Sequence, residues 1–243
     1  MPTTFDFPIH RDSLHEQVAD RIQGLIVDES LHPGDRLPGE RDLAERVGVS
    51  RTVIREAIHV LRVRGLVEVR PGSGTYIREL SPNDAAAPIG LLLKLRQVSD
   101  RYDDLHEIRR TLEVDIAGLA AERATEKDIA ALEEAIKGMA AHPEHADQFT
   151  RCDLAFHEAL AAATHNDLYT VLLTPITDLL LEFRLTAYTH DPQGSIEGAL
   201  TYHRRILSQI KNRDPQGARQ AMRDHLRQAS SLMEAARQDT AKS

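Results

Sequence analysis

The chain has 243 residues, of which 41% are hydrophobic and 28% charged, as is ordinary for a soluble globular protein of one large or two modest domains. No apolar run approaches the roughly 20 residues of a membrane span, the N-terminus lacks the charged-then-apolar layout of a secretory signal, and the single cysteine, Cys152, excludes an internal disulfide. We therefore expect a soluble, cytoplasmic protein that does not contact the membrane.

The net charge of −8 is distributed unevenly along the chain. Residues 1–78 hold 11 Lys and Arg against 12 Asp and Glu, whereas residues 79–243 hold 19 against 26. Within 45–70, six arginines stand against three glutamates. A local basic stripe matters more for phosphate contact than the total charge. The net charge therefore does not exclude a nucleic-acid partner, and the uneven distribution suggests two domains with different partners.

The first 78 residues mix helical and strand signals. "DSLHEQVADRIQGLIVDES" has helical spacing, and the Pro/Gly loop "LHPGDRLPGE" ends it. "ERDLAERVGVSRTVIREAIHVLRVRGL" predicts a short helix, a turn at Gly48 and a second helix, and "LVEVR" and "GTYIR" around "PGSG" predict a β-hairpin. This order is the layout of a winged helix-turn-helix.

The start of the second helix carries side chains suited to DNA. In a helix-turn-helix the N-terminal residues of the second helix reach base edges in the major groove. Ser50, Arg51 and Thr52 supply donors there, Arg55 lies one turn further on, and the tip "RPGSG" can approach a phosphate closely. The alternative is that the arginines only pair with Glu40, Glu56 or solvent.

The stretch "PGDRLPGERDLAERVGVSRTVIREAIHVLRVRGLVEVRPGSGTYI" resembles the DNA-binding domain of GntR-family bacterial transcription regulators, and the resemblance runs from about Leu14 to Ile77. It implies operator contacts from six positions: Arg41, Ser50, Arg51, Thr52, Arg55 and Gly72. Related proteins often have a basic or polar residue just before the wing glycine. Pro71 stands there in this chain, so that contact is not expected.

The remaining residues predict helices joined by short loops. Residues 79–88 are rich in small residues and proline, and we place a linker at 79–84, a helical bundle at 85–238 and a tail at 239–243. Helix starts are predicted at Thr125 with Asp128, at Asn166, at Ser195 and at Asp214 with Pro215, and Pro175 is expected to bend or split a helix. The fold class is therefore mainly α: an N-terminal winged helix-turn-helix with a small β wing, and a C-terminal all-α antiparallel bundle of six or seven helices.

Polar residues interrupt the apolar faces of three of these helices. Asp153 and His157 share a face with Phe156 and Leu160 in "DLAFHEAL", because positions i, i+3, i+4 and i+7 lie together. His203 heads the apolar face of "HRRILSQI", and His225 follows Met222 in "AMRDHL". A single inward histidine is best explained as a core residue with a hydrogen-bond partner. Four such groups together favour a divalent metal, which removes the cost of burying them; three nitrogens and one oxygen suit Zn²⁺, Ni²⁺, Mn²⁺ or Fe²⁺.

A further inward charge is Arg109, which shares a face with Leu105, Leu112 and Ile116. We expect Arg110 to turn instead toward Glu107 and Glu113. Arg109 either forms a structural ion pair or binds a ligand carboxylate through its two-pronged guanidinium.

Residues 85–236 resemble the effector-binding FCD domain of the FadR subgroup of the same family, on the pieces "DLAFHEAL", "TYHRRIL" and "AMRDHL". The resemblance implies that Asp153, His157, His203 and His225 are metal ligands, and that Arg109 binds the effector carboxylate. Some FadR-type proteins lack the metal set and bind acyl-CoA; the presence of all four ligands disfavours that mode here.

These observations predict a transcription regulator that binds a pseudo-palindromic operator as a homodimer. We expect a repressor, whose DNA affinity changes when a small organic acid or sugar acid binds at the metal. One rival is a metalloenzyme with a fused DNA-binding domain, although no general base is apparent and Glu158 lies on the wrong face. In a second rival the metal is purely structural.

Overall fold

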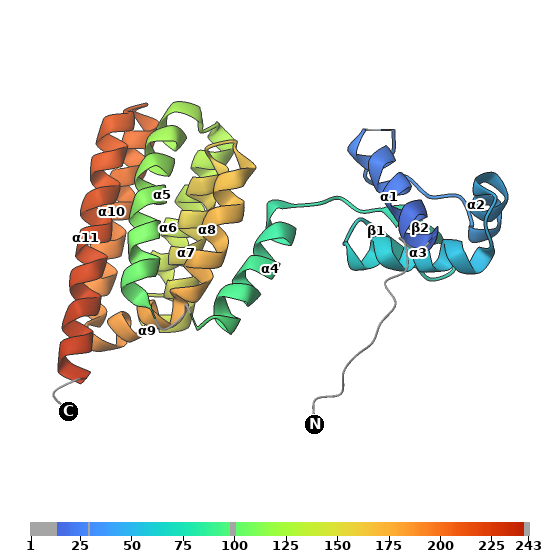
Figure 1. The fold of residues 1–243 in the computed structure, drawn as a ribbon. Helices are drawn as coiled ribbons and strands as arrows, with labels where there is room; N and C mark the ends of the chain where they lie inside the picture. The colour runs from blue at the N-terminus through green and yellow to red at the C-terminus, as the bar shows by residue number, and fades with distance from the viewer. Residues whose placement is uncertain (1–13, 29, 98–100, 241–243) are drawn as a thin grey trace, which may run out of the picture. The chain divides into compact units, whose positions relative to one another are not determined.

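The computed structural model describes residues 14–28, 30–97 and 101–240, and the chain divides into two compact units, Met1–Ser81 and Pro82–Ser243 (Figure 1). Among these residues no helix combines the length and the apolar character needed to cross a membrane. Of the predicted C-terminal tail, residues 239 and 240 continue the last helix, and residues 241–243 lie outside the described part.

The first unit is the predicted arrangement of helices and wing. Gly48 ends one helix in the left-handed conformation at φ +74°, and the Oγ of Ser50 accepts a hydrogen bond from the Val53 amide to start the next. The two strands pair antiparallel with Val67 opposite Ile77. Elements of this unit are α1 (Leu14–Val27), α2 (Glu40–Val47), α3 (Arg51–Val63), β1 (Val67–Arg70) and β2 (Gly74–Ile77).

The second unit is a helical bundle, so the predicted fold class is confirmed. Its helices in the described residues are α4 (Pro82–Leu95), α5 (Tyr102–Arg123), α6 (Glu126–Ala141), α7 (Ala146–Ala162), α8 (Asp167–Leu179), α9 (Leu181–His190), α10 (Pro192–Lys211) and α11 (Pro215–Thr240). The capping box of Thr125 and Asp128 and the caps at Asn166 and Asp214 form as predicted.

Three details of the bundle differ from the sequence prediction. Part of the predicted linker is helical, because Pro82 suits the first turn of a helix and the alanines that follow favour its continuation. α4 therefore adds an eighth helix to the expected six or seven. Ser195 is not a cap: Asp191 accepts from the Gly194 amide and Pro192 opens α10, so Ser195 lies inside the first turn. Pro175 stays within α8, and the break comes after Leu179.

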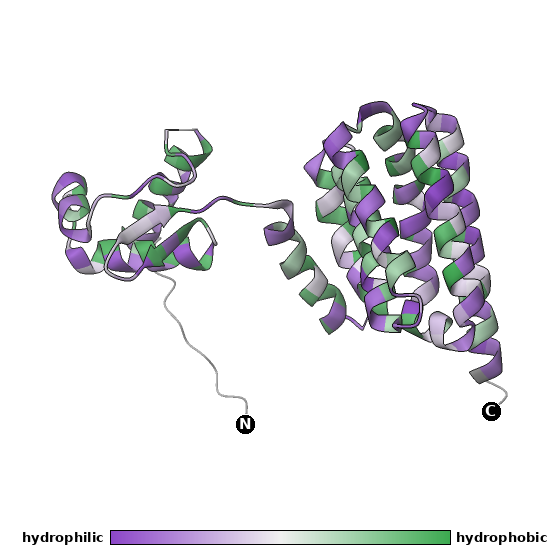
Figure 2. Cartoon of the chain, turned by 180° about the vertical axis from the view of Figure 1, so that it is seen from behind, coloured by the Kyte–Doolittle hydropathy of each residue, from purple (hydrophilic) through white to green (hydrophobic). Residues whose placement is uncertain are grey.

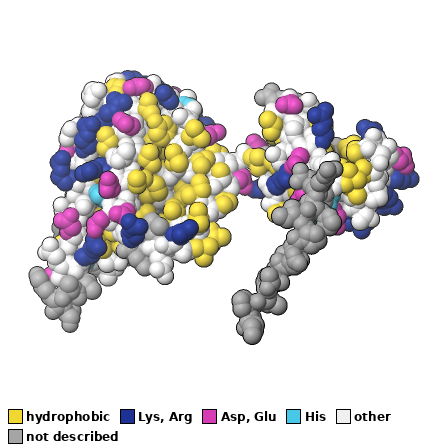
Figure 3. Space-filling view, in the orientation of Figure 1, with side chains coloured by type: hydrophobic (Ala, Val, Ile, Leu, Met, Phe, Trp, Pro, Cys, Tyr) yellow, Lys and Arg dark blue, Asp and Glu magenta, His cyan; other side chains and the backbone are white. Residues whose placement is uncertain are grey.

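The bundle core is formed by the inward faces of its helices, with Phe156, Ile206 and Met222 fully buried. Hydrophobic and hydrophilic residues accordingly divide around the helices (Figure 2). An exception is a hydrophobic patch on the bundle surface (Figure 3). Several leucines of α4 and α8, which pack on each other, are at least half exposed: Leu91, Leu92, Leu95, Leu168 and Leu172.

Candidate functional site

The first unit presents the six predicted DNA contacts on its surface. Arg41, Ser50, Arg51, Thr52, Arg55 and Gly72 are all exposed. Ser50 to Arg55 lie at or near the start of α3, where the helix N-terminus also favours a phosphate. Two of the arginines have acidic neighbours: Arg55 lies 3.6 Å from Glu40, and Arg41 lies 3.6 Å from Asp42. These exposed pairs are weak enough for a phosphate or base to replace them.

The wing turns at Gly72, whose φ of +71° favours glycine, and a Cβ there would meet nothing within 4 Å. Ser73 bonds to the hydroxyl of Tyr76, and the Arg70 guanidinium lies 4.4 Å from the Tyr76 ring centroid. These contacts hold the wing tip as a compact turn that can approach a DNA backbone.

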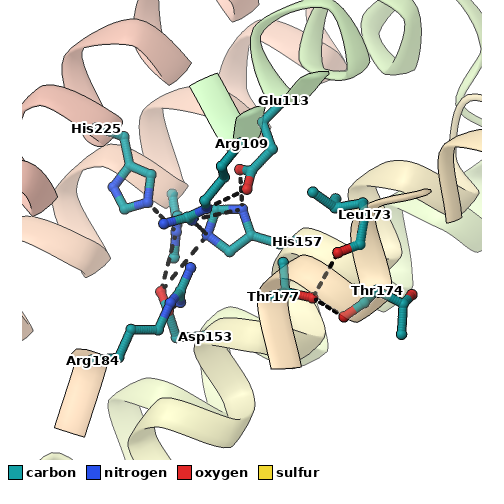
Figure 4. A network of polar contacts seen from close by, with 10 residues as sticks. Arg109, Glu113, Asp153, His157, Leu173, Thr174, Thr177, Arg184 and His225 are labelled. Carbon is teal, nitrogen blue, oxygen red and sulfur yellow. Dashed lines mark hydrogen bonds and ion pairs between the residues drawn. The ribbon is translucent and has the colours of Figure 1, made fainter. Parts of the chain in front are cut away.

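In the second unit, three helices bring Asp153, His157, His203 and His225 together. One ligand atom from each lies within 4.8 Å of the others, and the exposed fractions are 7%, 0%, 0% and 4%. The Nε2 atoms of His203 and His225 are 3.3 Å apart, and the Nε2 of His203 is 3.4 Å from the Asp153 carboxylate. The Nε2 of His157 is 4.0 Å from the same carboxylate. Figure 4 shows Asp153, His157 and His225 pointing toward a common centre.

The three imidazoles are held in their neutral form. Burial lowers the pKa of His157, and it lowers the pKa of His203 and His225 well below the usual value. Neighbouring positive charge, including that of Arg109, acts in the same direction. Neutral imidazoles have a free lone pair, which is the form that binds a metal.

Glu113 of α5 contacts the ring of His157 at its Nδ1 atom. Its side chain is fully buried, one oxygen lies 2.6 Å from the Nδ1 of His157, and the other contacts the Nε of Arg109. The expectation that Glu113 lies on the Arg110 side is wrong, because position i+4 returns to the face of Arg109. A carboxylate on Nδ1 fixes the tautomer in which Nε2 is the acceptor; here Nε2 faces the Nη2 of Arg109, which a metal at Nε2 would displace.

Arg109 lies between Glu113 and the histidine cluster. Its Nε contacts Glu113, and its Nη2 is 2.8 Å from the Nε2 of His157. It is 3% exposed, so the predicted inward orientation is what the structure has. It forms the ion pair with Glu113 and also lines a cavity beside the cluster, so the binding of a ligand carboxylate by Arg109 stays a prediction.

A cavity of about 70 Å³ opens beside the cluster, and Asp153 and His225 contribute to its lining. A second arginine, Arg184 of α9, also lines it and contacts the Asp153 carboxylate. Burial first, and then the nearby Arg109, lower the pKa of Arg184. Sequence reasoning missed this residue, although it shares a helix face with Leu180, Phe183, Ala187 and Tyr188, all of which line the cavity. The signal in the sequence was a charged residue among the apolar residues of one helix face.

Comparison with known proteins assigns both units. The gntR family of bacterial regulatory proteins matches residues 14–77, and the FCD domain matches residues 104–228. The regulator LutR of Bacillus subtilis (strain 168) is 34% identical over 205 residues, covering 83% of this chain and 93% of that protein.

Two further proteins match this chain over most of its length. A putative L-lactate dehydrogenase operon regulatory protein of Escherichia coli (strain K12) is 33% identical, covering 88% of this chain and 83% of that protein. A solved structure of Streptococcus agalactiae GntR superposes with a TM-score of 0.67 at 32% identity, covering 92% and 99% of the two chains.

Proposed function

Because this chain belongs to the GntR family of bacterial transcription regulators and carries an FCD domain, we propose that its second unit is a metal-dependent sensor of a small carboxylate. The first unit binds operator DNA, and the carboxylate changes its affinity. The observation that carries this proposal is the convergence of four buried ligand atoms beside a cavity that Asp153 and His225 line together with Arg109 and Arg184.

The residues of the cluster fit a divalent metal. A tetrahedral ion with bonds of about 2.0–2.1 Å separates its ligand atoms by roughly 3.3–3.4 Å. The separations of 3.3 Å between His203 and His225 and 3.4 Å between His203 and Asp153 match that spacing, whereas the 4.0 Å between His157 and Asp153 is wider. When bound there, the metal would supply a Lewis-acidic centre for oxygen atoms of the ligand; Zn²⁺, Ni²⁺, Mn²⁺ and Fe²⁺ all suit the donor set.

The proposed effector class is a small organic acid. One relative's name associates it with an L-lactate dehydrogenase operon, so L-lactate is the first compound to test. An effector can regulate DNA binding only if the protein has two conformations that differ in DNA affinity and the effector binds one of them more tightly. We propose repression that the acid relieves.

The test is DNA binding by the zinc-loaded protein with and without L-lactate. The proposal expects saturable L-lactate binding and a changed operator affinity, with both effects lost after chelation. Turnover of the acid would instead favour the metalloenzyme. Unchanged L-lactate binding by the chelated, still folded fraction would assign the metal a purely structural role.

We further propose that two copies pair, because a pseudo-palindromic operator has two half-sites and each chain has one DNA-binding unit. The hydrophobic patch of α4 and α8 offers the second copy an uncharged surface. Leu92→Lys with Leu172→Lys should then convert dimer to monomer in sedimentation experiments, whereas Val63→Lys, at an exposed position on α3, should leave the dimer intact. A dimer that survives the leucine changes would place the interface elsewhere.

A further inference from the structure

Arg184 has a contact on one side of its guanidinium and none on the other. Its Nη1 contacts Asp153, whereas Nε and Nη2 are buried and have no hydrogen-bond partner among the described residues. The side chain is 14% exposed and lines the cavity, so solvent has little access to these donors. A buried charged group with unmet donors is costly unless another molecule satisfies them.

The free side of Arg184 has a defined shape. The Nε and Nη2 hydrogens of a guanidinium point in parallel from one edge of the plane, and this edge accepts the two oxygens of a carboxylate at once. The Nη1 contact with Asp153 uses the other side and fixes the plane of the group. The free edge is therefore oriented before any ligand arrives.

Arg109 lacks such an edge. Its Nε contacts Glu113, and its Nη2 lies 2.8 Å from the His157 Nε2. A metal at Nε2 would displace the Nη2 contact, but the Nε contact with Glu113 would remain, so the complete Nε–Nη2 edge is not free. Both partners are buried side chains of the bundle, and Arg109 holds them in place. Both arginines line the cavity, but the Nε of Arg109 is bound to Glu113, whereas the Nε and Nη2 of Arg184 have no partner among the described residues.

We propose that Arg184, and not Arg109, binds the carboxylate of the effector through its Nε–Nη2 edge, and that Arg109 is a positioning residue for His157. This inference rests on the proposed function, since it assigns the carboxylate of that effector to a residue. It also places the carboxylate next to Asp153, at the side of the proposed metal centre.

The rest of the cavity restricts the effector further. Its wall is apolar at Leu180, Phe183 and Met233, and it includes the Oγ of Ser195, which is buried without a partner in the described part of the chain. A volume of about 70 Å³ leaves room for only a few heavy atoms. The combination fits a short hydroxy acid: one carboxylate for Arg184, and a hydroxyl that can bond to Ser195 or bind at the metal centre.

The experiment compares L-lactate with L-lactamide, its neutral amide, by calorimetry on the zinc-loaded full chain. Arg184→Lys keeps a positive charge beside Asp153 and removes the planar edge; Arg109→Lys is the matched control, and Arg184→Gln is a second variant. Zinc content and thermal unfolding are measured for each protein, so a folding or metal defect is seen directly.

We expect Arg184→Lys, which keeps the charge and loses one of the two hydrogen bonds, to weaken L-lactate binding by roughly 10- to 150-fold. Arg184→Gln, which also removes the charge, should weaken it by at least as much. Binding of L-lactamide should change by less than about threefold, with zinc content unchanged. Arg109→Lys should lower zinc affinity and keep the ratio of L-lactate to L-lactamide affinity.

Other outcomes overturn the assignment in distinguishable ways. If Arg109→Lys removes the preference for L-lactate while zinc stays bound, Arg109 is the carboxylate residue. If Arg184→Lys keeps wild-type L-lactate affinity, Arg184 is structural, and the proposed sensor function stands. If the wild-type protein binds none of L-lactate, D-lactate and glycolate, this inference and the proposed effector class both fail.

Discussion

Replacing Glu113 by glutamine is the sharpest test of the buried network, because the change keeps the shape of the side chain and removes its charge. Glu113 is fully buried and contacts both Arg109 and the Nδ1 of His157. Glu113→Gln therefore leaves Arg109, which is 3% exposed, without its counter-ion. It also weakens the acceptor that orients His157.

The expected magnitude follows from these two losses. Breaking a buried ion pair by removing one partner costs about 3–5 kcal/mol, and the amide oxygen of glutamine restores part of this, so we expect about 3 kcal/mol. For the unit Pro82–Ser243 that corresponds to a fall in Tm of roughly 6–12 °C. Loss of a carboxylate behind a metal-bound histidine lowers metal affinity by about 10- to 100-fold.

Thermal unfolding in the presence of a chelator measures the stability change, and competition with a chromophoric chelator measures zinc affinity. Glu107→Gln is the matched control: it lies on the same helix, is exposed, and should change stability by less than about 0.5 kcal/mol. If the two variants have the same Tm and the same zinc affinity, Glu113 does not stabilise Arg109 or His157 in the way the contacts indicate.

Three further predictions address the other elements. His203→Ala should lower metal content and the response to L-lactate while operator binding by the metal-free protein persists; full metal occupancy would rule His203 out as a ligand. Arg51→Ala should lose operator discrimination in gel-shift assays, by about 1–3 kcal/mol for a lost base contact, whereas Arg62→Ala, in the last turn of α3, should keep it. Burial, with Arg109 second, lowers the pKa of His106 from 6.5 to about 4. Between these pH values His106 is protonated more readily in the unfolded chain than in the folded one, so the free energy of unfolding should fall as the pH is lowered from 6.5 toward 4. His106→Gln should make the free energy of unfolding less dependent on pH in this range.

Helical periodicity in the sequence was sufficient to predict the residues that face the centre of the bundle. Asp153 and His157 lie one turn apart on an apolar face, and that spacing fixes their direction whatever they bind. His203 and His225 follow by the same rule on other helices. Their convergence on one point depends on the packing of three helices, which no local pattern specifies.

The site residues that the sequence did not reveal also lie at inward positions of their helices, but their sequence signal is weaker. Arg184 stands in an apolar stripe of α9, but an arginine is long enough to reach solvent from such a position, so its stripe is weak evidence of burial. The sequence prediction pairs Glu113 with Arg110 at i−3, but Arg109 at i−4 lies equally close on a helix. Asp191 followed by Pro192 is a stronger start signal than Ser195, so α10 begins before the serine and the Ser195 side chain lines the cavity instead.

The charges around the cluster support the proposed binding role. Hydrolysis at a metal is assisted by a group that accepts a proton near neutral pH. Although burial raises the pKa of Glu113, Arg109 and then His157 outweigh it and hold that pKa at about 2. Glu158 has a raised pKa, caused by burial and by Asp178, yet it is not among the residues that line the cavity. Glu113 therefore stays ionised and orients His157 without taking a proton, while the donors that line the cavity are suited to hold an anion, as a sensor requires.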